Sequence, residues 1–172
     1  MVEIAGAAVR AELLALHVQS FGWALSCCGR HRTNAEDALS LAYDKVLSGA
    51  ARFDGRAAFK TWLFAVIRRT ANEQRRSRLL RSMVLLRFFE APEPPTRPDE
   101  QTDSARRAEA LVLALAELSA RQREVLHLVF YEGMTVREAA VAMEVATGTA
   151  SLHYERGKER LLERLREKGI RE

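Results

Sequence analysis

Cysteine is scarce in this sequence: the chain has only Cys27 and Cys28, in adjacent positions. Adjacent cysteines rarely form a disulfide with each other, and a disulfide-stabilised scaffold needs more thiols than this. The two thiols and the nearby His17 and His31 match no common zinc-ligand spacing, so buried thiols beside a helix end are the simpler interpretation. A redox-sensing role stays open as an alternative. We therefore expect a cytoplasmic protein in a reducing compartment, with no metal and no other cofactor.

Long apolar runs are missing as well. No run of about 18 apolar residues occurs, so the sequence predicts no transmembrane helix and no membrane insertion. Glu3 precedes any basic residue, and Arg10 and Glu12 interrupt the first apolar segment, which is not the pattern of a signal peptide. The chain also has no glycine-rich phosphate-binding loop and no cluster of catalytic residue types. We therefore expect no enzymatic activity.

Proline is confined to one short segment, because all four prolines lie between Pro92 and Pro98. Proline fixes its own backbone and disfavours helix at the residue before it, so residues 90–104 are predicted to be extended. The acidic residues of this segment repel one another and make self-packing unfavourable. The sequence therefore predicts a linker over residues 88–104, between domains over residues 1–87 and 105–172.

Charge is unevenly distributed along the chain, whose overall balance is 27 Lys and Arg against 23 Asp and Glu, or net +4. Residues 1–87 have 14 basic and 7 acidic residues (net +7), and residues 88–104 have 1 and 5 (net −4). Residues 105–172 have 12 and 11 (net +1). A mildly basic chain of this kind is compatible with a nucleic-acid partner but does not require one.

Both sides of the linker have helical periodicity and no convincing strand pattern, so the predicted fold class is all-α, with two small helical domains. In the first half, Asn34 is placed to cap a helix that continues to Leu47. A longer helix is expected over residues 56–81. Its buried face is expected to hold the apolar residues Phe59, Trp62, Leu63 and Val66.

The second part of that helix is basic, and aromatic residues lie close to it in the sequence. From Arg68 to Arg87 there are seven arginines and a single acid, Glu73. A basic surface with aromatic side chains is the composition that holds single-stranded nucleic acid. The simpler alternatives are a solvated basic face and aromatic residues buried in the core. Phe53, which lies in the loop before the helix, is least constrained by the core interpretation.

Helix-start signals are clear in the second half. Ser119 with Gln122, and Thr135 with Glu138, each have the spacing of a capping box. Gly133, between the two boxes, can end the first of these helices in a left-handed conformation. The second half is therefore predicted to consist of short helices with defined beginnings.

Residues 135–160 have the dimensions of a helix-turn-helix motif. The second helix is expected to begin at Gly148, with Thr147 as a candidate N-cap, and to turn Ala150 and Tyr154 toward the core. Its polar side chains would then be available for base edges and phosphates in a major groove. The alternative is a plain helical hairpin within a bundle.

Three segments together resemble a known family: AEDALSLAYDKVL (Ala35 to Leu47), RFDGRAAFKTWLFAVIRR (Arg52 to Arg69) and LSARQREVLHLVFYEGMTVREAAVAM (Leu118 to Met143). They resemble bacterial RNA polymerase sigma factors. Their order and separation are similar to the small extracytoplasmic-function (ECF) group of the sigma-70 family, which keeps two DNA-binding domains joined by a linker. The resemblance covers roughly residues 35–76 and 115–161.

The resemblance implies a transcription initiation factor that binds core RNA polymerase, directs it to promoters and assists promoter melting. Residues 1–87 would be a region 2-like domain for core polymerase and the minus-ten element, and residues 105–172 a region 4-like domain for the minus-thirty-five element. The linker would pass the polymerase active centre toward the RNA exit path. The implied partners are core polymerase, promoter DNA, both duplex and single-stranded non-template strand, and an anti-sigma factor. The rival interpretation is a helix-turn-helix regulator that is not a polymerase subunit.

The resemblance also implies candidate residues for each contact. The helix over residues 36–46 would bind the clamp of the largest polymerase subunit through Asp37, Ser40, Leu41, Asp44 and Lys45. The loop at residues 53–58 and the helix after it would contact the minus-ten element through Phe53, Asp54, Arg56, Lys60, Arg68, Arg69, Asn72, Arg75 and Arg76. The helix-turn-helix would contact the minus-thirty-five element through Thr147, Thr149, Ser151, His153, Arg156 and Lys158.

Some positions depart from the family pattern. Ser40 stands where the family often has Gln, Arg69 where it often has Asn, and Glu73 where it often has Asp. In the turn of the helix-turn-helix, Glu144 and Ala146 stand where Gly and Ser are usual. The resemblance therefore predicts the class of protein, and it does not predict the promoter sequence.

Overall fold

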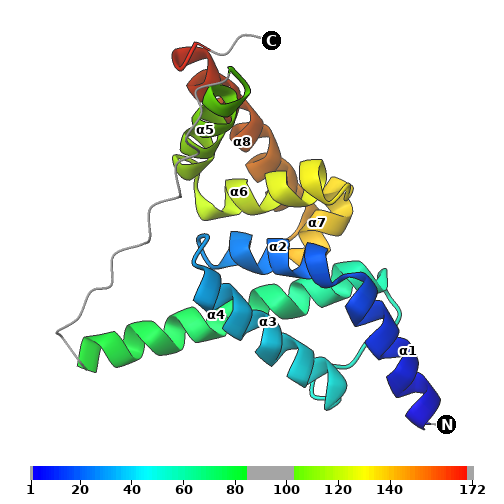
Figure 1. The fold of residues 1–172 in the computed structure, drawn as a ribbon. Coiled ribbons are helices and arrows are strands. Elements are labelled where there is room, and N and C mark those ends of the chain that lie inside the picture. Colours follow the sequence, from blue (N-terminus) through cyan, green and yellow to red (C-terminus); the bar gives the residue numbers. More distant parts are fainter. Residues whose placement is uncertain (1, 85–102, 170–172) are drawn as a thin grey trace. The chain divides into compact units, whose positions relative to one another are not determined.

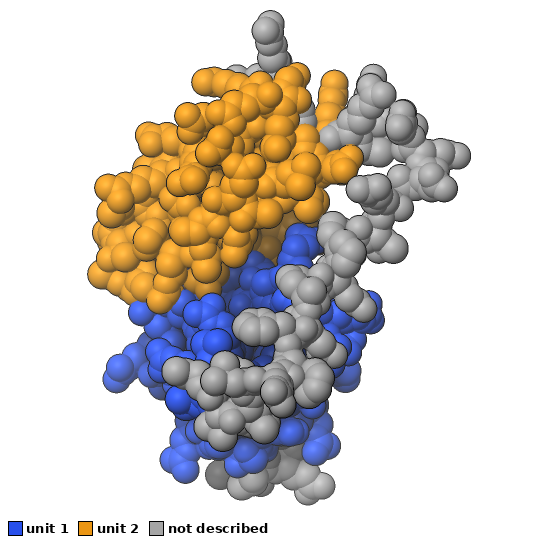
Figure 2. All heavy atoms as spheres, turned by 90° about the vertical axis from the view of Figure 1, so that its left-hand side faces the viewer, with its two compact units in different colours: residues 1–92, 141–144 blue, residues 93–140, 145–172 orange. Residues whose placement is uncertain are grey.

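The computed structural model describes residues 2–84 and 103–169, and within these ranges the chain forms helices, turns and loops with no strand (Figure 1). The predicted all-α fold class is therefore confirmed. The chain divides into two compact units, residues 1–92 with 141–144 and residues 93–140 with 145–172 (Figure 2). The α-helices are α1 (Val2–Ala15), α2 (His17–Cys27), α3 (Arg32–Leu47), α4 (Phe59–Val84), α5 (Asp103–Ala116), α6 (Ala120–Leu126), α7 (Val136–Ala142) and α8 (Thr147–Glu167).

The core of the first unit is built by α2, α3 and α4, which pack against one another, with α1 against α2 and α3. Trp23 of α2 lies at its centre and is fully buried. Its ring stacks on Phe64 of α4 with the centroids 5.7 Å apart, and its indole Nε1 donates a hydrogen bond of 2.9 Å to the Phe64 carbonyl. A buried indole with a satisfied N–H fixes α2 firmly on α4. Leu63 and Ile67 of α4 are fully buried in the same unit.

Several predicted helix boundaries in the first unit and the linker are wrong. The N-cap of α3 is His31, so Asn34 lies inside the helix and does not cap it. Helix α4 begins at Phe59 rather than at residue 56, because the chain before it is a loop in which Gly55 has a φ of 75°. Helix α5 begins at Asp103, which was expected to be part of the linker. Residues 88–102, the remainder of that predicted linker, lie outside the described residues, as do residues 85–87 of the predicted first domain.

Both predicted capping boxes of the second half are confirmed. The Gln122 backbone N–H donates to Ser119 Oγ at 3.3 Å, and the Ser119 N–H donates to Gln122 Oε1 at 3.0 Å. The Glu138 N–H donates to Thr135 Oγ1 at 3.2 Å, and the Thr135 N–H donates to Glu138 Oε2 at 2.8 Å. Gly133 has the predicted left-handed conformation, with a φ of 68°. The beginnings of α6 and α7 are thus set by residues three positions apart.

In the second unit α8 packs on α6 and α5. Gly157 permits the close approach of α8 to α6, because an added Cβ would lie 3.2 Å from the Gln122 Cβ and 3.3 Å from the Leu126 Cδ1. A five-residue π-helical segment, His127–Tyr131, follows α6, and no sequence signal predicted it. Helix α8 begins at Thr147 with Ala146 as its N-cap and no side-chain cap, so the expectation that Thr147 caps the helix is wrong.

Candidate functional site

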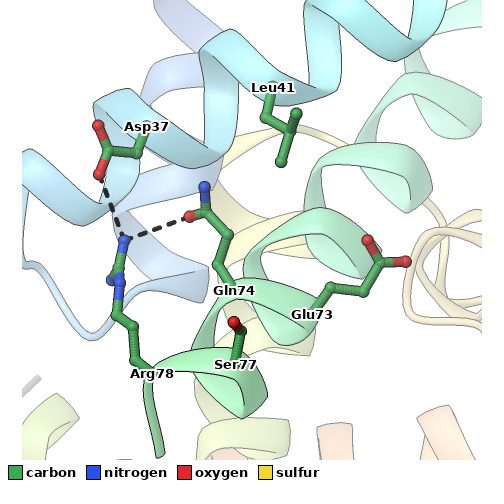
Figure 3. A pocket seen from close by; sticks show the side chains of 6 residues that line it. All are labelled: Asp37, Leu41, Glu73, Gln74, Ser77 and Arg78. Atoms are coloured by element: carbon green, nitrogen blue, oxygen red, sulfur yellow. Dashed lines mark hydrogen bonds and ion pairs between the residues drawn. The ribbon is translucent and has the colours of Figure 1, made fainter. Parts of the chain in front are cut away.

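A shallow pocket of about 390 Å³ lies between α3 and α4 in the first unit (Figure 3). Arg78 of α4 lies at the edge of the pocket and reaches toward α3. Its guanidinium nitrogen Nη2 donates to Asp37 Oδ2 and to Gln74 Oε1, each at 3.4 Å. Leu41 projects into the same region and remains 39% exposed. The pocket therefore combines an exposed apolar side chain with charged groups of both signs. The residues that line it are Asp37, Leu41, Glu73, Gln74, Ser77 and Arg78.

The residues predicted to bind polymerase do not all have the same surroundings. Asp37, Ser40, Leu41 and Asp44 are exposed on α3. Lys45 is the exception, because its side chain is only 28% exposed. Its Nζ donates to Glu73 Oε2 at 2.5 Å and to Thr70 Oγ1 at 3.2 Å. Lys45 therefore joins α3 to α4, which the sequence alone did not indicate.

An aromatic cluster lies at the beginning of α4 and in the loop before it. The Phe53 ring centroid lies 5.4 Å from that of Phe59 and 5.3 Å from that of Trp62. Phe53 is 44% exposed, while Phe59 and Trp62 are half-buried, so this cluster is only partly in the core. In the same loop the Arg56 N–H donates to Asp54 Oδ1 at 3.1 Å, and its side-chain Nε lies 3.3 Å from Asp54 Oδ2. These contacts define a loop that presents an aromatic face beside charged groups.

The polar and basic candidates of α4 differ in their exposure. Arg68 is only 5% exposed, so its side chain has almost no surface with which to contact DNA. Asn72 and Lys60 are half-buried, and the Lys60 ammonium lies 5.5 Å from the centroid of the Phe64 ring. Exposed guanidinium groups are well suited to phosphate oxygens. The exposed arginines among the candidates on α4 are Arg75, Arg76 and Arg69, and the Arg69 guanidinium already donates to the Glu144 carboxylate.

On α8, burial identifies the packed and the exposed sides of the helix. Ala150 and Gly157 are buried, and Tyr154 is half-buried on the same side as predicted. Of the predicted DNA contacts, His153 and Lys158 are half-buried. The exposed residues in the first half of the helix include two that were not predicted, Leu152 and Glu155. The full set of exposed non-glycine residues there is Thr147, Thr149, Ser151, Leu152, Glu155 and Arg156.

Lys158 is held by neighbours within the second unit. Its Nζ lies 3.1 Å from Glu155 Oε2 and 4.7 Å from the centroid of the Tyr154 ring. The Tyr154 ring in turn lies 5.9 Å from that of Phe130. The hydrogen bond that Lys158 donates to Glu155 raises the pKa of Lys158, and the negative charge of the same carboxylate adds to this effect. Lys158 is therefore a protonated group of restricted orientation beside the exposed face of α8.

Cys27 and Cys28 lie at the end of α2, are half-buried, and neither is in a disulfide. Burial raises the pKa of the Cys28 thiol, and the positive charge of Arg78 partly opposes this shift. A raised pKa leaves little thiolate at neutral pH and makes the group a poor nucleophile.

Within residues 2–84 and 103–169, no three His, Cys, Asp or Glu side chains gather to hold a metal ion. None of the helices described in the structure is both long and apolar enough to cross a bilayer.

Comparison with known proteins matches both halves of the chain. Residues 15–79 match sigma-70 region 2, and residues 108–161 match sigma-70 region 4. The ECF RNA polymerase sigma factor SigX of Bacillus subtilis is 27% identical over 133 residues, covering 74% of this chain and 69% of that protein. The RNA polymerase sigma factor CarQ of Myxococcus xanthus is 28% identical over 156 residues, covering 91% and 88% of the two chains. Among solved structures, the chain is similar to the sigma factor RpoE from Bartonella quintana, which was solved in complex with the anti-sigma factor NepR. The two chains superpose with a TM-score of 0.71 at 26% sequence identity, and the match covers 92% of this chain and 96% of RpoE.

Proposed function

We propose that this chain, which belongs to the ECF group of the sigma-70 family, binds core RNA polymerase, directs it to specific promoters and assists strand separation there. The observation that carries the proposal is the presence of both matched regions in one chain, region 2 over residues 15–79 and region 4 over residues 108–161. A regulator that only binds duplex DNA through a helix-turn-helix needs no region 2. The two matches, in this order, therefore support a polymerase subunit.

For core polymerase we propose the exposed side of α3 as the contact surface. Asp37, Ser40, Leu41 and Asp44 are exposed there, and the pocket beside Leu41 could take an apolar side chain of the partner. We assign Lys45 a different role, because it is engaged with Glu73 of α4. It would hold α3 in position rather than contact polymerase. An exposed apolar residue surrounded by charged groups is a common arrangement in protein interfaces.

For promoter DNA we propose two surfaces, one on each unit. The aromatic cluster around Phe53 and the exposed arginines of α4 would hold single-stranded non-template bases of the minus-ten element. The exposed face of α8 would enter the major groove of the minus-thirty-five element, with Arg156 on a phosphate. We also propose an anti-sigma partner, because the similar RpoE chain was solved with its anti-sigma factor NepR. The division into two domains is part of this proposal, with the first ending near residue 87 and the second beginning at Asp103, where α5 starts.

Run-off transcription of fragmented genomic DNA by purified core polymerase, with and without this protein, tests the proposal. We expect discrete new transcripts that share an upstream sequence element, and permanganate reactivity of thymines just upstream of each start site. Absence of new transcripts, together with duplex binding and failure to co-purify with core polymerase, would instead support the helix-turn-helix regulator.

A further inference from the structure

The exposed face of α8 has two residues whose chemistry differs from that of an ordinary phosphate-binding surface. Leu152 is 47% exposed, and the Glu155 side chain is 59% exposed. Both lie in the first half of α8, on the side away from the buried Ala150 and Gly157. In helix-turn-helix proteins this part of the second helix is the one that contacts base edges.

Neither side chain suits a phosphate contact. Leucine has no hydrogen-bond donor, and a carboxylate is repelled by the DNA backbone. Both suit the floor of the major groove, where a carboxylate accepts a hydrogen bond from the cytosine N4 amino group and an apolar side chain contacts the thymine methyl group. Leu152 and Glu155 are three residues apart, which places them about 4.5 Å apart along the helix axis. That spacing is about 1 Å longer than the roughly 3.4 Å between successive base pairs, a difference that flexible side chains can span.

The ion pair on α8 makes an acid on this face compatible with DNA binding. Lys158 Nζ lies 3.1 Å from Glu155 Oε2, and the same ammonium is held over the Tyr154 ring at 4.7 Å. The nearby positive charge reduces the repulsion between the carboxylate and the phosphates. A carboxylate has about four acceptor positions, so one contact with Lys158 leaves others for a base. Glu155 is therefore oriented by its neighbours while it remains able to accept from DNA.

We infer that Leu152 and Glu155 are specificity-determining residues, which read a thymine methyl group and a cytosine amino group at neighbouring base pairs of the upstream promoter element. The inference rests on the proposed function and names the bases that this site selects. Ser151 and Arg156 flank these residues and are exposed. They would position the helix in the groove by contacting phosphates of the DNA backbone.

The test uses the full chain assembled with core polymerase and a promoter library randomised across the upstream element, with transcripts sequenced to give a base preference at each position. For Glu155→Gln we expect about a tenfold loss of the preference for cytosine at one position, with adenine gaining, because glutamine pairs with adenine. For Leu152→Ala we expect the preference for thymine at an adjacent position to fall about threefold. The other positions should keep their preferences in both variants.

Two further variants separate this inference from its rivals. Glu163→Gln makes the same chemical change at an exposed position two turns farther along α8 and should leave every preference unchanged. Lys158→Met should weaken binding at all sequences without altering which bases are preferred. If Lys158→Met reproduces the Glu155→Gln profile, Glu155 acts only by holding Lys158 and the inference is overturned. The inference also fails, with the sigma function intact, if Glu155→Gln selects the same bases as the unchanged protein. A holoenzyme that selects no sequence at all overturns both.

Discussion

At Gly157 the packing of α8 on side chains of α6 leaves little room for a side chain. This residue lies in the middle of α8, where glycine is intrinsically unfavourable by about 1 kcal/mol relative to alanine. An added Cβ would lie 3.2 Å from the Gln122 Cβ and 3.3 Å from the Leu126 Cδ1, so these groups would have to shift by a few tenths of an ångström to admit it. Sequence reasoning had no means of finding this contact, because Gly157 and α6 are brought together only by the fold.

Gly157→Ala should lower the free energy of unfolding by about 1 kcal/mol, because an overpacking cost of about 1–3 kcal/mol exceeds the gain in helix propensity. Gly148→Ala is the matched control on the same helix, where nothing lies within 4 Å of the added Cβ, and it should cost nothing. Thermal unfolding followed by circular dichroism compares the two variants. Equal stability of the two would contradict the packing argument.

Arg156 is the exposed guanidinium in the first half of α8. Arg156→Ala should weaken duplex binding to all sequences and reduce the slope of log K against log salt by about one unit, because one phosphate contact is lost. Arg166→Ala, near the far end of α8 and also exposed, should leave the slope unchanged. Fluorescence anisotropy over a range of salt concentrations measures both. A slope that stays the same for Arg156→Ala would remove this residue from the interface.

At the scale of elements, sequence patterns predicted a helix boundary correctly where the two residues that hydrogen-bond to each other lie within one helical turn. The two capping boxes were predicted correctly because Ser119 and Gln122, and likewise Thr135 and Glu138, are three residues apart. The beginning of α3 was predicted wrongly, because a residue of N-capping type at position 34 does not exclude an earlier start. Arg32 and Glu36 form an ion pair of 2.9 Å across that earlier first turn.

Helix α3 should lose polymerase affinity when its exposed acids are reversed. Asp37→Lys combined with Asp44→Lys should weaken binding to core polymerase by about tenfold, because two charges in the proposed interface change sign. The control is Glu12→Lys combined with Glu163→Lys, which changes the net charge equally on exposed residues of other helices. Affinity is measured with labelled protein, and circular dichroism checks helicity. Unchanged affinity in a folded variant would exclude this face.

The basic part of α4 should act after polymerase binding. Arg75→Ala combined with Arg76→Ala should reduce open-complex formation about tenfold, because two exposed groups that could hold the single strand are lost, while polymerase affinity changes little. Arg10→Ala combined with Arg107→Ala serves as the charge-matched control. Permanganate footprinting detects unpaired thymines. Footprints as strong as those of the unchanged protein would count against a melting role for this helix.

At the scale of the whole molecule, the two tryptophans report on one unit only, because Trp23 and Trp62 both lie in the first. Each unit has a core of its own, with Trp23 and Phe64 in one and Val125 and Leu128 in the other. Tryptophan fluorescence should therefore follow the unfolding of the first unit, whereas circular dichroism follows both.

Gly157→Ala should accordingly shift the unfolding midpoint seen by circular dichroism and leave the tryptophan fluorescence midpoint in place, since the substitution lies in the second unit. Chemical denaturation recorded with both probes on the same samples measures this. Trp23→Phe is the complementary variant, because it should move the transition of the first unit through loss of the indole hydrogen bond to the Phe64 carbonyl. A fluorescence shift equal to the dichroism shift in Gly157→Ala would mean that the two units unfold together.

The sequence by itself determined the all-α class, the capping boxes and the family, because helical periodicity, capping and motif spacing are all local patterns. Only the tertiary structure decided which charged groups are engaged with one another. Lys45 and Glu73 are 28 residues apart, and Asp37 and Arg78 are 41 apart, so no local pattern brings them together. On α8 the inward side was predicted correctly from Ala150 and Tyr154. Leu152 and Glu155 were nevertheless missed, because an apolar and an acidic side chain are not the residue types that sequence reasoning assigns to a DNA contact.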